Sequence, residues 1–476
     1  MSLAIMWFRQ DLRCLDNPAL SAACEAHESI IPLYILQNPN ESIGGAQVWW
    51  LHHSLSCLQK ELGIHSLNLN LKRGNPYQIL KELTEEYPVT GVYWNRCYEP
   101  ASIERDQHIK KELRALGITV NSFNGSLFNE PWTIKNKSGN PFRVFTPYWK
   151  HSLNQIKIPE PFIIKNWPKN FPIHSENLMD WYLLPKKPNW AKNFDQFWQP
   201  GEQGAIKKLE QFVQQPIQNY QQYRDFPTKA ATSRLSPHLH FGEISPWQIA
   251  RAIEQVQVQP DSNLASTQCF LTELGWREFS YYQLFHFPDL PFKNLKQEFD
   301  LFSWQTDNKN LRLWQQGLTG FPIVDAGMRE LWHTGYMHNR VRMIVASFLV
   351  KDLFIDWREG AKWFWYTLLD ADLANNSASW QWIAGSGFDA SPYFRIFNPV
   401  IQGEKFDPKG EYIKTWIPEL KKLPEKWIHK PWEAPLNVLP VKLGIDYPRP
   451  LVNHNEAKRK ALQYYDSIKK SKLLNT

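Results

Sequence analysis

DADLANNSASWQW, residues 370–382, brings two carboxylates, two neighbouring amides and two tryptophans into one short segment. Its flanks, WFWYTLL before it and IAGSGFDASPYF after it, are strongly apolar, so we expect the segment to be buried. Buried polar groups at this density need hydrogen-bond partners, and a protein interior alone seldom supplies so many. The segment therefore predicts a bound polar cofactor. The alternative is a capped helix end with two packing tryptophans.

The two tryptophans of this segment, Trp380 and Trp382, are two residues apart. On a helix, side chains at this spacing point to nearly opposite sides. We therefore expect one of them to face the cofactor and the other to face something else.

Composition indicates an ordinary soluble globular protein, and a length of 476 residues favours two domains. The aromatic content is unusual, with 23 Trp, 18 Tyr and 27 Phe, and stacking on planar ligands such as bases or a flavin would explain part of it. A net charge of +7 is compatible with a partner that has a phosphate backbone but does not identify one.

The five cysteines are scattered and contain no CxxC pair, which favours a reducing compartment without disulfides, a zinc site or an iron–sulfur cluster. The apolar run LAIMWF at the N-terminus is too short for a signal peptide, and no run approaches the length of a membrane span. We therefore expect a cytoplasmic protein without membrane association.

Residues 1–128 alternate apolar runs with helical patterns, which predicts a doubly wound parallel sheet. The predicted strands are 3–8, 31–36, 67–71, 89–94 and 119–123. No GxGxxG or GxxxxGK[ST] motif occurs, so phosphates are not bound in the way that is usual for this architecture.

Residues 129–200 are rich in proline and tryptophan and have poor periodicity, so they are interpreted as a long connector on the surface. Helical patterns then dominate residues 201–476, including 264–285, 337–353 and 358–368. The chain closes with a basic amphipathic helix. The expected fold is thus an α/β domain, a connector and an all-α domain.

Several groups in the helical part suggest ligand contacts. Thr232, Ser233, Arg234 and Ser236 supply hydroxyls and a guanidinium before a helix, which suits a pyrophosphate, although a capped helix start explains them equally well. The nearby His238 and His240 lack an evident third metal ligand and are interpreted as core histidines. No metal site is expected.

Glu273 and Trp276 share one helical face, where a tryptophan can stack on a planar heterocycle and a carboxyl can hydrogen-bond it. Asn339 and Met343 likewise share a face, with Arg340 and Arg342 turned aside. Arg395 lies between aromatic residues, as a phosphate clamp would. Taken alone, Glu273 and Trp276 are better explained as a surface glutamate beside a core tryptophan. The alternative for the segment with Asn339 and Met343 is an amphipathic helix with a solvated arginine face.

Taken together, the motifs MWFRQDLR, TSRLSP, WREF, TGFPIVDAGMREL, TGYMHNRVRMI, DADLANNSASWQW and PYFRIFNP resemble the cryptochrome/DNA photolyase family. The resemblance runs to about residue 420 and points to the cyclobutane pyrimidine dimer branch, class I or its close bacterial relatives. It implies an antenna-binding α/β domain over 1–128, a connector over 129–200 and a helical FAD- and DNA-binding domain over 201–476.

The resemblance also implies roles for individual residues. FAD would be held by Tyr220, Thr232, Ser233, Arg234, Leu235, Ser236, Phe270, Arg342, Asp370, Ala371, Asp372 and Asn376, with Asn376 facing flavin N5. The dimer and its DNA would be bound by Arg224, Glu273, Trp276, Arg277, Asn339, Arg340, Met343, Trp382 and Arg395. Trp380, Trp357 and Trp304 match the tryptophan chain that photoreduces the flavin in this family. Phe270 stands where class I relatives have a tryptophan.

The implied activity is that of a deoxyribodipyrimidine photo-lyase, in which light drives an electron from reduced FAD to a flipped-out dimer. Glu273 is expected to be a protonated donor in a partly apolar environment. A six-four photolyase would have histidines at 339 and 343, and a plant cryptochrome would have Asp at 376 and generally a long C-terminal extension. The remaining alternatives are a blue-light receptor without repair activity and a single-strand nucleic-acid binder.

The antenna chromophore is open between methenyltetrahydrofolate, which we favour, 8-hydroxy-5-deazaflavin, a second flavin and none. The segment WNRCYEPASIERD, residues 94–106, lies where some relatives contact the folate but lacks the Asn-Glu pair expected there. The expected partner is DNA that contains pyrimidine dimers, bound by a monomer that associates with the nucleoid through DNA.

Overall fold

The computed structural model describes residues 2–37, 43–389 and 394–474. A parallel sheet with the strand order β3-β2-β1-β4-β5 forms the N-terminal part. Its strands are β1 (Leu3–Phe8), β2 (Ser29–Leu36), β3 (Asn70–Arg73), β4 (Val89–Asn95) and β5 (Thr119–Phe123). β1 and β2 are buried along their whole length, as parallel strands covered on both faces should be. The predicted doubly wound fold is confirmed, with the third strand shifted from 67–71 to β3.

The helices between the strands are α1 (Pro18–Ala26), α3 (Gly45–Ile64), α4 (Pro76–Glu86) and α5 (Pro100–Ala115). Proline opens α1, α4 and α5, where the missing N–H costs no helical hydrogen bond. The side chains of Asn17 and Asn75 accept backbone N–H groups at the starts of α1 and α4. These local signals explain why the helices begin where the sequence pattern placed them.

The connector does more than cover the surface. It contains the helix α6 (Phe145–Leu153) and a two-residue strand, β6 (Lys169–Asn170), that pairs in parallel with the start of β2. It also forms the 3₁₀ turns η1 (Pro131–Thr133), η2 (Leu178–Trp181) and η3 (Phe194–Gln196). Phe145, Trp149, Trp181 and Phe194 in this region are buried. The prediction of a surface connector is therefore incomplete, because several of its aromatic side chains belong to the core.

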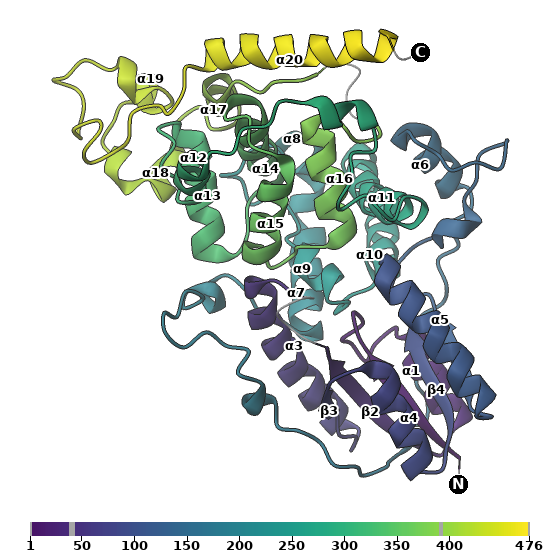
Figure 1. Ribbon diagram of the computed structural model, residues 1–476. Helices are drawn as coiled ribbons and strands as arrows, with labels where there is room; N and C mark the ends of the chain where they lie inside the picture. The colour runs from purple at the N-terminus through teal and green to yellow at the C-terminus, as the bar shows by residue number, and fades with distance from the viewer. Residues whose placement is uncertain (1, 38–42, 390–393, 475–476) are drawn as a thin grey trace.

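Helices make up the remainder of the described chain (Figure 1). They are α7 (Glu202–Gln214), α8 (Tyr220–Tyr223), α9 (Ser236–His240), α10 (Pro246–Gln257), α11 (Leu264–His286), α12 (Asn308–Gln315), α13 (Pro322–Thr334), α14 (Asn339–Ser347), α15 (Trp357–Thr367), α16 (Leu373–Ala384), α17 (Pro399–Phe406), α18 (Glu411–Trp416), α19 (Glu425–Ile428) and α20 (His454–Leu474). Within the described residues, no helix is long and apolar enough to cross a membrane.

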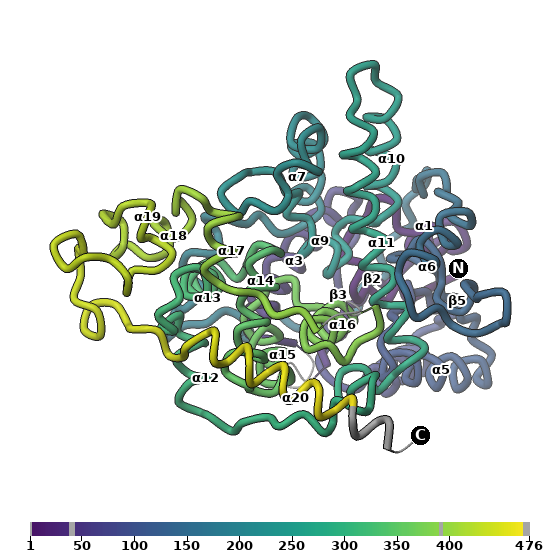
Figure 2. Tube along the Cα trace, turned by 90° about the horizontal axis from the view of Figure 1, so that it is seen from above, coloured from purple at the N-terminus to yellow at the C-terminus, as the bar shows by residue number. Residues whose placement is uncertain are grey.

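The predicted helix over 337–353 is shorter than expected. α14 begins at Asn339 and is followed by a π-helical turn, η6 (Phe348–Asp352). The final helix, α20, packs on η6 and on the 3₁₀ turn η5 (Gln297–Leu301), and it crosses the helical domain at the end farthest from the sheet (Figures 1 and 2).

Buried polar contacts join the sheet region to the helical domain. Arg13, fully buried, donates from Nη1 to the carbonyl of Gly242 at 2.8 Å. Trp50 on α3 donates from Nε1 to Glu243 at 2.9 Å. Gly242 has φ +64°, and an added Cβ would lie 2.0 Å from the carbonyl oxygen of Gln10, so only glycine permits this close approach.

Candidate functional site

Asp372 is the N-cap of α16 and the centre of a buried polar network. Its carboxylate accepts the backbone N–H of Asn375 at 2.8 Å and the hydroxyl of Tyr281 on α11. His240 of α9 lies 3.7 Å away, from Nδ1 to Oδ2. Burial alone would raise the pKa of Asp372, but the nearby imidazole of His240 and the hydrogen bonds from Tyr281 and Asn375 lower the pKa to about 2. The protein itself therefore supplies most of this carboxylate's partners, contrary to the sequence-based argument.

Asp370 differs from Asp372, because one of its two carboxylate oxygens has no hydrogen-bond partner among the described residues. Oδ2 accepts hydrogen bonds from the hydroxyl of Ser236 at 2.5 Å and from Nη2 of Arg342 at 2.8 Å. Oδ1 is buried and has no hydrogen-bond partner among the described residues. A buried carboxylate oxygen requires a donor. This oxygen fits a bound group that carries polar N–H or O–H groups, as FAD does.

The loop before α9 lies beside these residues. Ser236 ties the loop to Asp370, and Arg234, which has φ +53°, places its guanidinium 5.0 Å from the ring centre of Tyr336. Arg342 lies over the same tyrosine at 5.3 Å. Thr232 and Ser233 are partly buried, and Leu235 is buried. Two arginines over one ring concentrate positive charge, which suits the predicted contact with FAD phosphates.

The remaining predicted cofactor residues lie on α8, on α11, on α16 and, for Ala371, in the turn just before α16. Tyr220 on α8 is buried and meets Phe270 on α11 edge to face at 5.3 Å, and burial raises the pKa of Tyr220. Ala371 is also buried. Asn376 on α16 donates from Nδ2 to the carbonyl of Ala361 at 3.0 Å, which fixes the orientation of its amide.

Glu273 forms an ion pair with Arg224, with Oε1 and Nη1 2.5 Å apart. Both side chains are about one-quarter exposed, at 26% and 24%. The role of Glu273 as a protonated donor stays a prediction, and the ion pair places a guanidinium against the same carboxyl group. It also links the predicted lesion contact to the predicted DNA contact.

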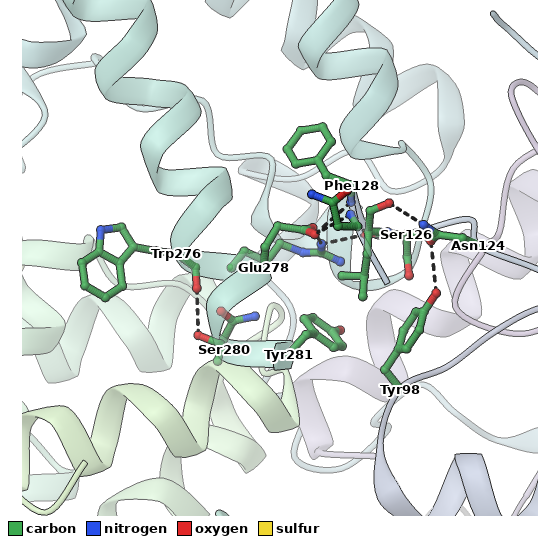
Figure 3. Close-up of polar contacts among 12 residues, drawn as sticks. Tyr98, Asn124, Ser126, Phe128, Trp276, Glu278, Ser280 and Tyr281 are labelled. Carbon is green, nitrogen blue, oxygen red and sulfur yellow. Dashed lines mark hydrogen bonds and ion pairs between the residues drawn. The ribbon is translucent and has the colours of Figure 1, made fainter. Parts of the chain in front are cut away.

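Trp276 lies on one side of α11, and Glu278 and Tyr281 with their polar contacts lie on the other side (Figure 3). Its ring stacks on Phe145 of the connector, with ring centres 3.7 Å apart and planes at 10°. Trp382 on α16 donates from Nε1 to the carbonyl of Asp389 at 3.1 Å. Both tryptophans are only partly buried, so both retain surface for a ligand.

Arg277 does not lie with the predicted DNA contacts. It donates from Nη1 to the carbonyl of Ser126 at 2.8 Å and lies 3.4 Å from Glu278. Its guanidinium is also 4.9 Å from the ring centre of Tyr281, and its side chain is only 12% exposed. These contacts join α11 to the chain that follows β5, and the DNA-binding role of Arg277 stays a prediction.

α14 carries Asn339, exposed at its start, and Met343, partly buried one turn later. Arg340 pairs with Asp225 at 2.8 Å and lies 4.4 Å from the ring centre of Phe406. Arg395 is exposed. Three residues of the motif SPYFRIFNP that contains it, at 391–393, lie outside the described residues.

Of the three tryptophans predicted to form an electron chain, Trp357 and Trp380 belong to one hydrophobic cluster and Trp304 packs against that cluster. Trp380 and Trp357 are buried, whereas Trp304 is partly exposed. Trp380 packs against Phe364 at 5.0 Å and against Gly360 on α15, three residues after Trp357. Trp380 and Trp382 thus have different surroundings, as their spacing in the sequence predicts.

The two histidines of α9 have structural partners. His238 and Glu243 are fully buried and hydrogen-bonded through Nδ1, and His240 contacts Gln47 of α3 at 3.1 Å. No sequence motif indicates Tyr281 as a partner of Asp372 or Phe145 as a neighbour of Trp276, because both contacts join segments far apart in the chain.

Comparisons with known proteins identify the family of the chain. Residues 4–166 match the family model described as DNA photolyase, and residues 270–467 match the one described as FAD binding domain of DNA photolyase. The chain is 50% identical over 477 residues to a deoxyribodipyrimidine photo-lyase of Agrobacterium fabrum, covering 98% of each chain. It is 40% identical to cryptochrome-2 of Arabidopsis thaliana, covering 95% of this chain and 77% of the relative.

A solved structure described as a bacterial class III photolyase from Agrobacterium tumefaciens superimposes with a TM-score of 0.93 at 49% identity, covering 99% of this chain and 98% of that one. This relative does not bear out class I specifically. With both parts of the chain matched and full-length relatives at this identity, the protein belongs to the cryptochrome/DNA photolyase family.

Proposed function

We propose that this protein repairs cyclobutane pyrimidine dimers in DNA in a light-dependent reaction. One observation carries the proposal: α11, α14 and α16 each hold a predicted cofactor residue and a predicted lesion residue. These pairs are Phe270 and Trp276, Arg342 and Met343, and Asn376 and Trp382. α16 packs against both α11 and α14, so a lesion bound by the second set would lie beside a cofactor bound by the first.

FAD, when bound, would supply the light-driven electron. Ser236, Arg342 and Asp370 would hold it, with Asp370 Oδ1 accepting one of its N–H or O–H groups. Asn376, oriented by the carbonyl of Ala361, would present its amide oxygen to the ligand. A fixed polar lining around a buried ligand avoids reorganisation when the charge distribution changes.

The lesion residues would receive a dinucleotide turned out of the duplex. Unstacking and unpairing cost a few kcal/mol, and less for a damaged pair that is already poorly stacked. Stacking on Trp276 and Trp382 would offset that cost. The ion pair of Glu273 and Arg224 places a carboxylate and a guanidinium together at the same site, where they would hydrogen-bond base edges and backbone.

Arg224, Arg340 and Arg395 would contact phosphates, consistent with the net charge of +7. We propose a monomer that acts in the cytoplasm and associates with the nucleoid through DNA. Given the 49% identical class III structure, we place the protein nearer that branch than class I. Folate remains the favoured antenna, and an absorption band beyond that of FAD in the purified protein would test for one.

A blue-light receptor without repair activity is the second candidate, because a plant cryptochrome is 40% identical over 95% of the chain. The experiment that separates the two is illumination of the purified, reduced protein with a thymine-dimer oligonucleotide. Restored thymine absorbance in the light and none in the dark is the expected result. Flavin photoreduction without repair would favour the receptor.

A further inference from the structure

The predicted lesion tryptophans, Trp276 and Trp382, are connected through two residues that no motif singled out. Phe145, the first residue of α6, stacks on Trp276 with ring centres 3.7 Å apart. Its backbone N–H donates to the carboxylate of Asp389 at 3.2 Å. The carbonyl of Asp389 in turn accepts Nε1–H of Trp382 at 3.1 Å. A continuous path thus runs from α11 through the connector to the segment after α16.

Phe145 covers one face of Trp276. The planes lie at 10°, and the edge of the indole meets Phe279 at 6.2 Å and 69°. The ring of Phe145 also stacks on that of Trp149, with ring centres 6.3 Å apart. Trp149 packs against Gly275, where an added Cβ would lie 2.6 Å from the Trp149 indole. With one face of its indole stacked on Phe145, Trp276 is restricted in its rotation and has one face left for a base.

Asp389 acts as a cap for α6 from a distant part of the chain. Val144, the N-cap residue, makes no side-chain hydrogen bond, and the carboxylate of Asp389 accepts the first N–H of the helix instead. Asp389 itself has φ +53°, a conformation that Asp and Asn tolerate better than other side chains. Beside it, Arg143 lies 5.2 Å from the ring centre of Phe388, a second contact between the connector and this segment.

We infer that Phe145 and Asp389 form a brace that fixes the spacing and orientation of Trp276 and Trp382, and that this brace sets the preference for dimer-containing over undamaged DNA. The inference rests on the proposed function, since it assumes that the two tryptophans receive the flipped dimer. Phe145 and Asp389 are positioning residues, because they act through the tryptophans.

A brace of this kind should act on damaged DNA alone. When Trp276 and Trp382 are already held in place, binding of a flipped dinucleotide costs little side-chain entropy. This preorganisation increases affinity. Undamaged duplex keeps its bases stacked, so it is bound through phosphate contacts that do not involve the tryptophans. Loosening the brace should therefore lower the ratio of the two affinities.

The first variant is Phe145→Leu, which removes the stacked ring and keeps an apolar side chain. Its matched control is Phe142→Leu, the same substitution three residues earlier in the connector, where the ring meets Tyr148 at 6.3 Å. Dissociation constants are measured in the dark by fluorescence anisotropy, for one oligonucleotide with and without a thymine dimer, using the full chain with bound FAD. We expect Phe145→Leu to weaken binding of the dimer-containing duplex about tenfold, with undamaged duplex and Phe142→Leu within about twofold of wild type.

The second pair of variants concerns Asp389. Asp389→Asn keeps a carbonyl oxygen that can accept the Phe145 N–H and tolerates the positive φ, so it should retain the wild-type preference. Asp389→Ala removes the acceptor and should lose preference for the dimer as Phe145→Leu does. Rescue by Asn separates positioning from general destabilisation, and FAD absorbance and circular dichroism check that each variant is folded.

The outcomes are distinct. Selective loss in Phe145→Leu and Asp389→Ala, with Asp389→Asn and Phe142→Leu like wild type, supports the brace. A Phe145→Leu variant that prefers the dimer as strongly as Phe142→Leu overturns it while leaving the proposed function intact. If wild-type protein itself shows no preference for the dimer, the proposed function is overturned and the brace with it.

Discussion

Gly360→Ala tests whether Trp380 occupies a tightly packed slot beside α15. A Cβ at position 360 would lie 2.1 Å from Cη2 of Trp380 and 2.6 Å from Cζ2, whereas ordinary contact begins near 3.4 Å. Phe364 at 5.0 Å and Trp314 at 6.4 Å enclose the same indole, which is only 2% exposed. The ring would have to move by more than about an ångström into space that is already filled.

The expected stability change follows from two opposing terms. Ala is favoured over Gly inside a helix by about 0.5–1 kcal/mol, while overpacking a filled core costs about 1–3 kcal/mol. We expect a net loss of about 1 kcal/mol for Gly360→Ala. The control is Gly63→Ala, on the exposed end of α3, where an added Cβ meets nothing within 4 Å. That variant should gain about 0.5–1 kcal/mol.

Guanidinium unfolding measures both variants, with FAD absorbance recorded to follow cofactor retention. Because Trp380 is the predicted electron donor nearest the flavin, Gly360→Ala should also photoreduce FAD more slowly than Gly63→Ala at equal FAD content. If the two variants have the same stability and the same rate of photoreduction, the packing argument for Trp380 is refuted.

Three further predictions follow from the same contacts. Trp304→Phe should slow photoreduction of oxidised FAD and leave repair by chemically reduced protein unchanged; reduced repair in the second assay would contradict the electron-chain assignment. Glu273→Gln should lower repair yield and affinity for the dimer-containing duplex several-fold, because Arg224 loses its charged partner; wild-type behaviour at every pH would remove Glu273 from the site. Burial lowers the pKa of Lys351 to about 7 from 10.5, so the unfolded chain binds more protons between these values and the unfolding free energy should rise with pH there. In denaturant titrations between pH 7 and 10.5, Lys351→Met should reduce the increase in unfolding free energy by a few kcal/mol. The same increase in the variant and the wild type would contradict the burial argument.

The sheet could be predicted because its signals are local. β1 and β2 are continuous apolar runs, and proline with asparagine marks the helix starts beside them. β6 could not be predicted, since two residues, Lys169 and Asn170, carry no periodicity. They form a strand only because β3 pairs with the end of β2 and leaves Ser29 and Ile30 at its start open. The π-helical turn after α14 likewise has no local pattern.

In the candidate site, too, local features could be predicted and contacts between distant segments could not. Helical spacing correctly separated the surroundings of Trp380 and Trp382. It could not show that Asp372 is satisfied by Tyr281 from another helix, or that Arg277 turns toward Ser126. These outcomes depend on tertiary partners, and a residue's type alone does not identify its partner.

Light-dependent repair of cyclobutane dimers is tested most directly with a thymine-dimer oligonucleotide and the purified protein, whose bound FAD has been reduced. Matched samples are kept in the dark or illuminated with near-UV and blue light, and an oligonucleotide that carries a six-four photoproduct serves as the second substrate. We expect thymine absorbance to be restored only in the light and only for the cyclobutane dimer. Photoreduction of the flavin with no repair of either lesion would contradict this expectation.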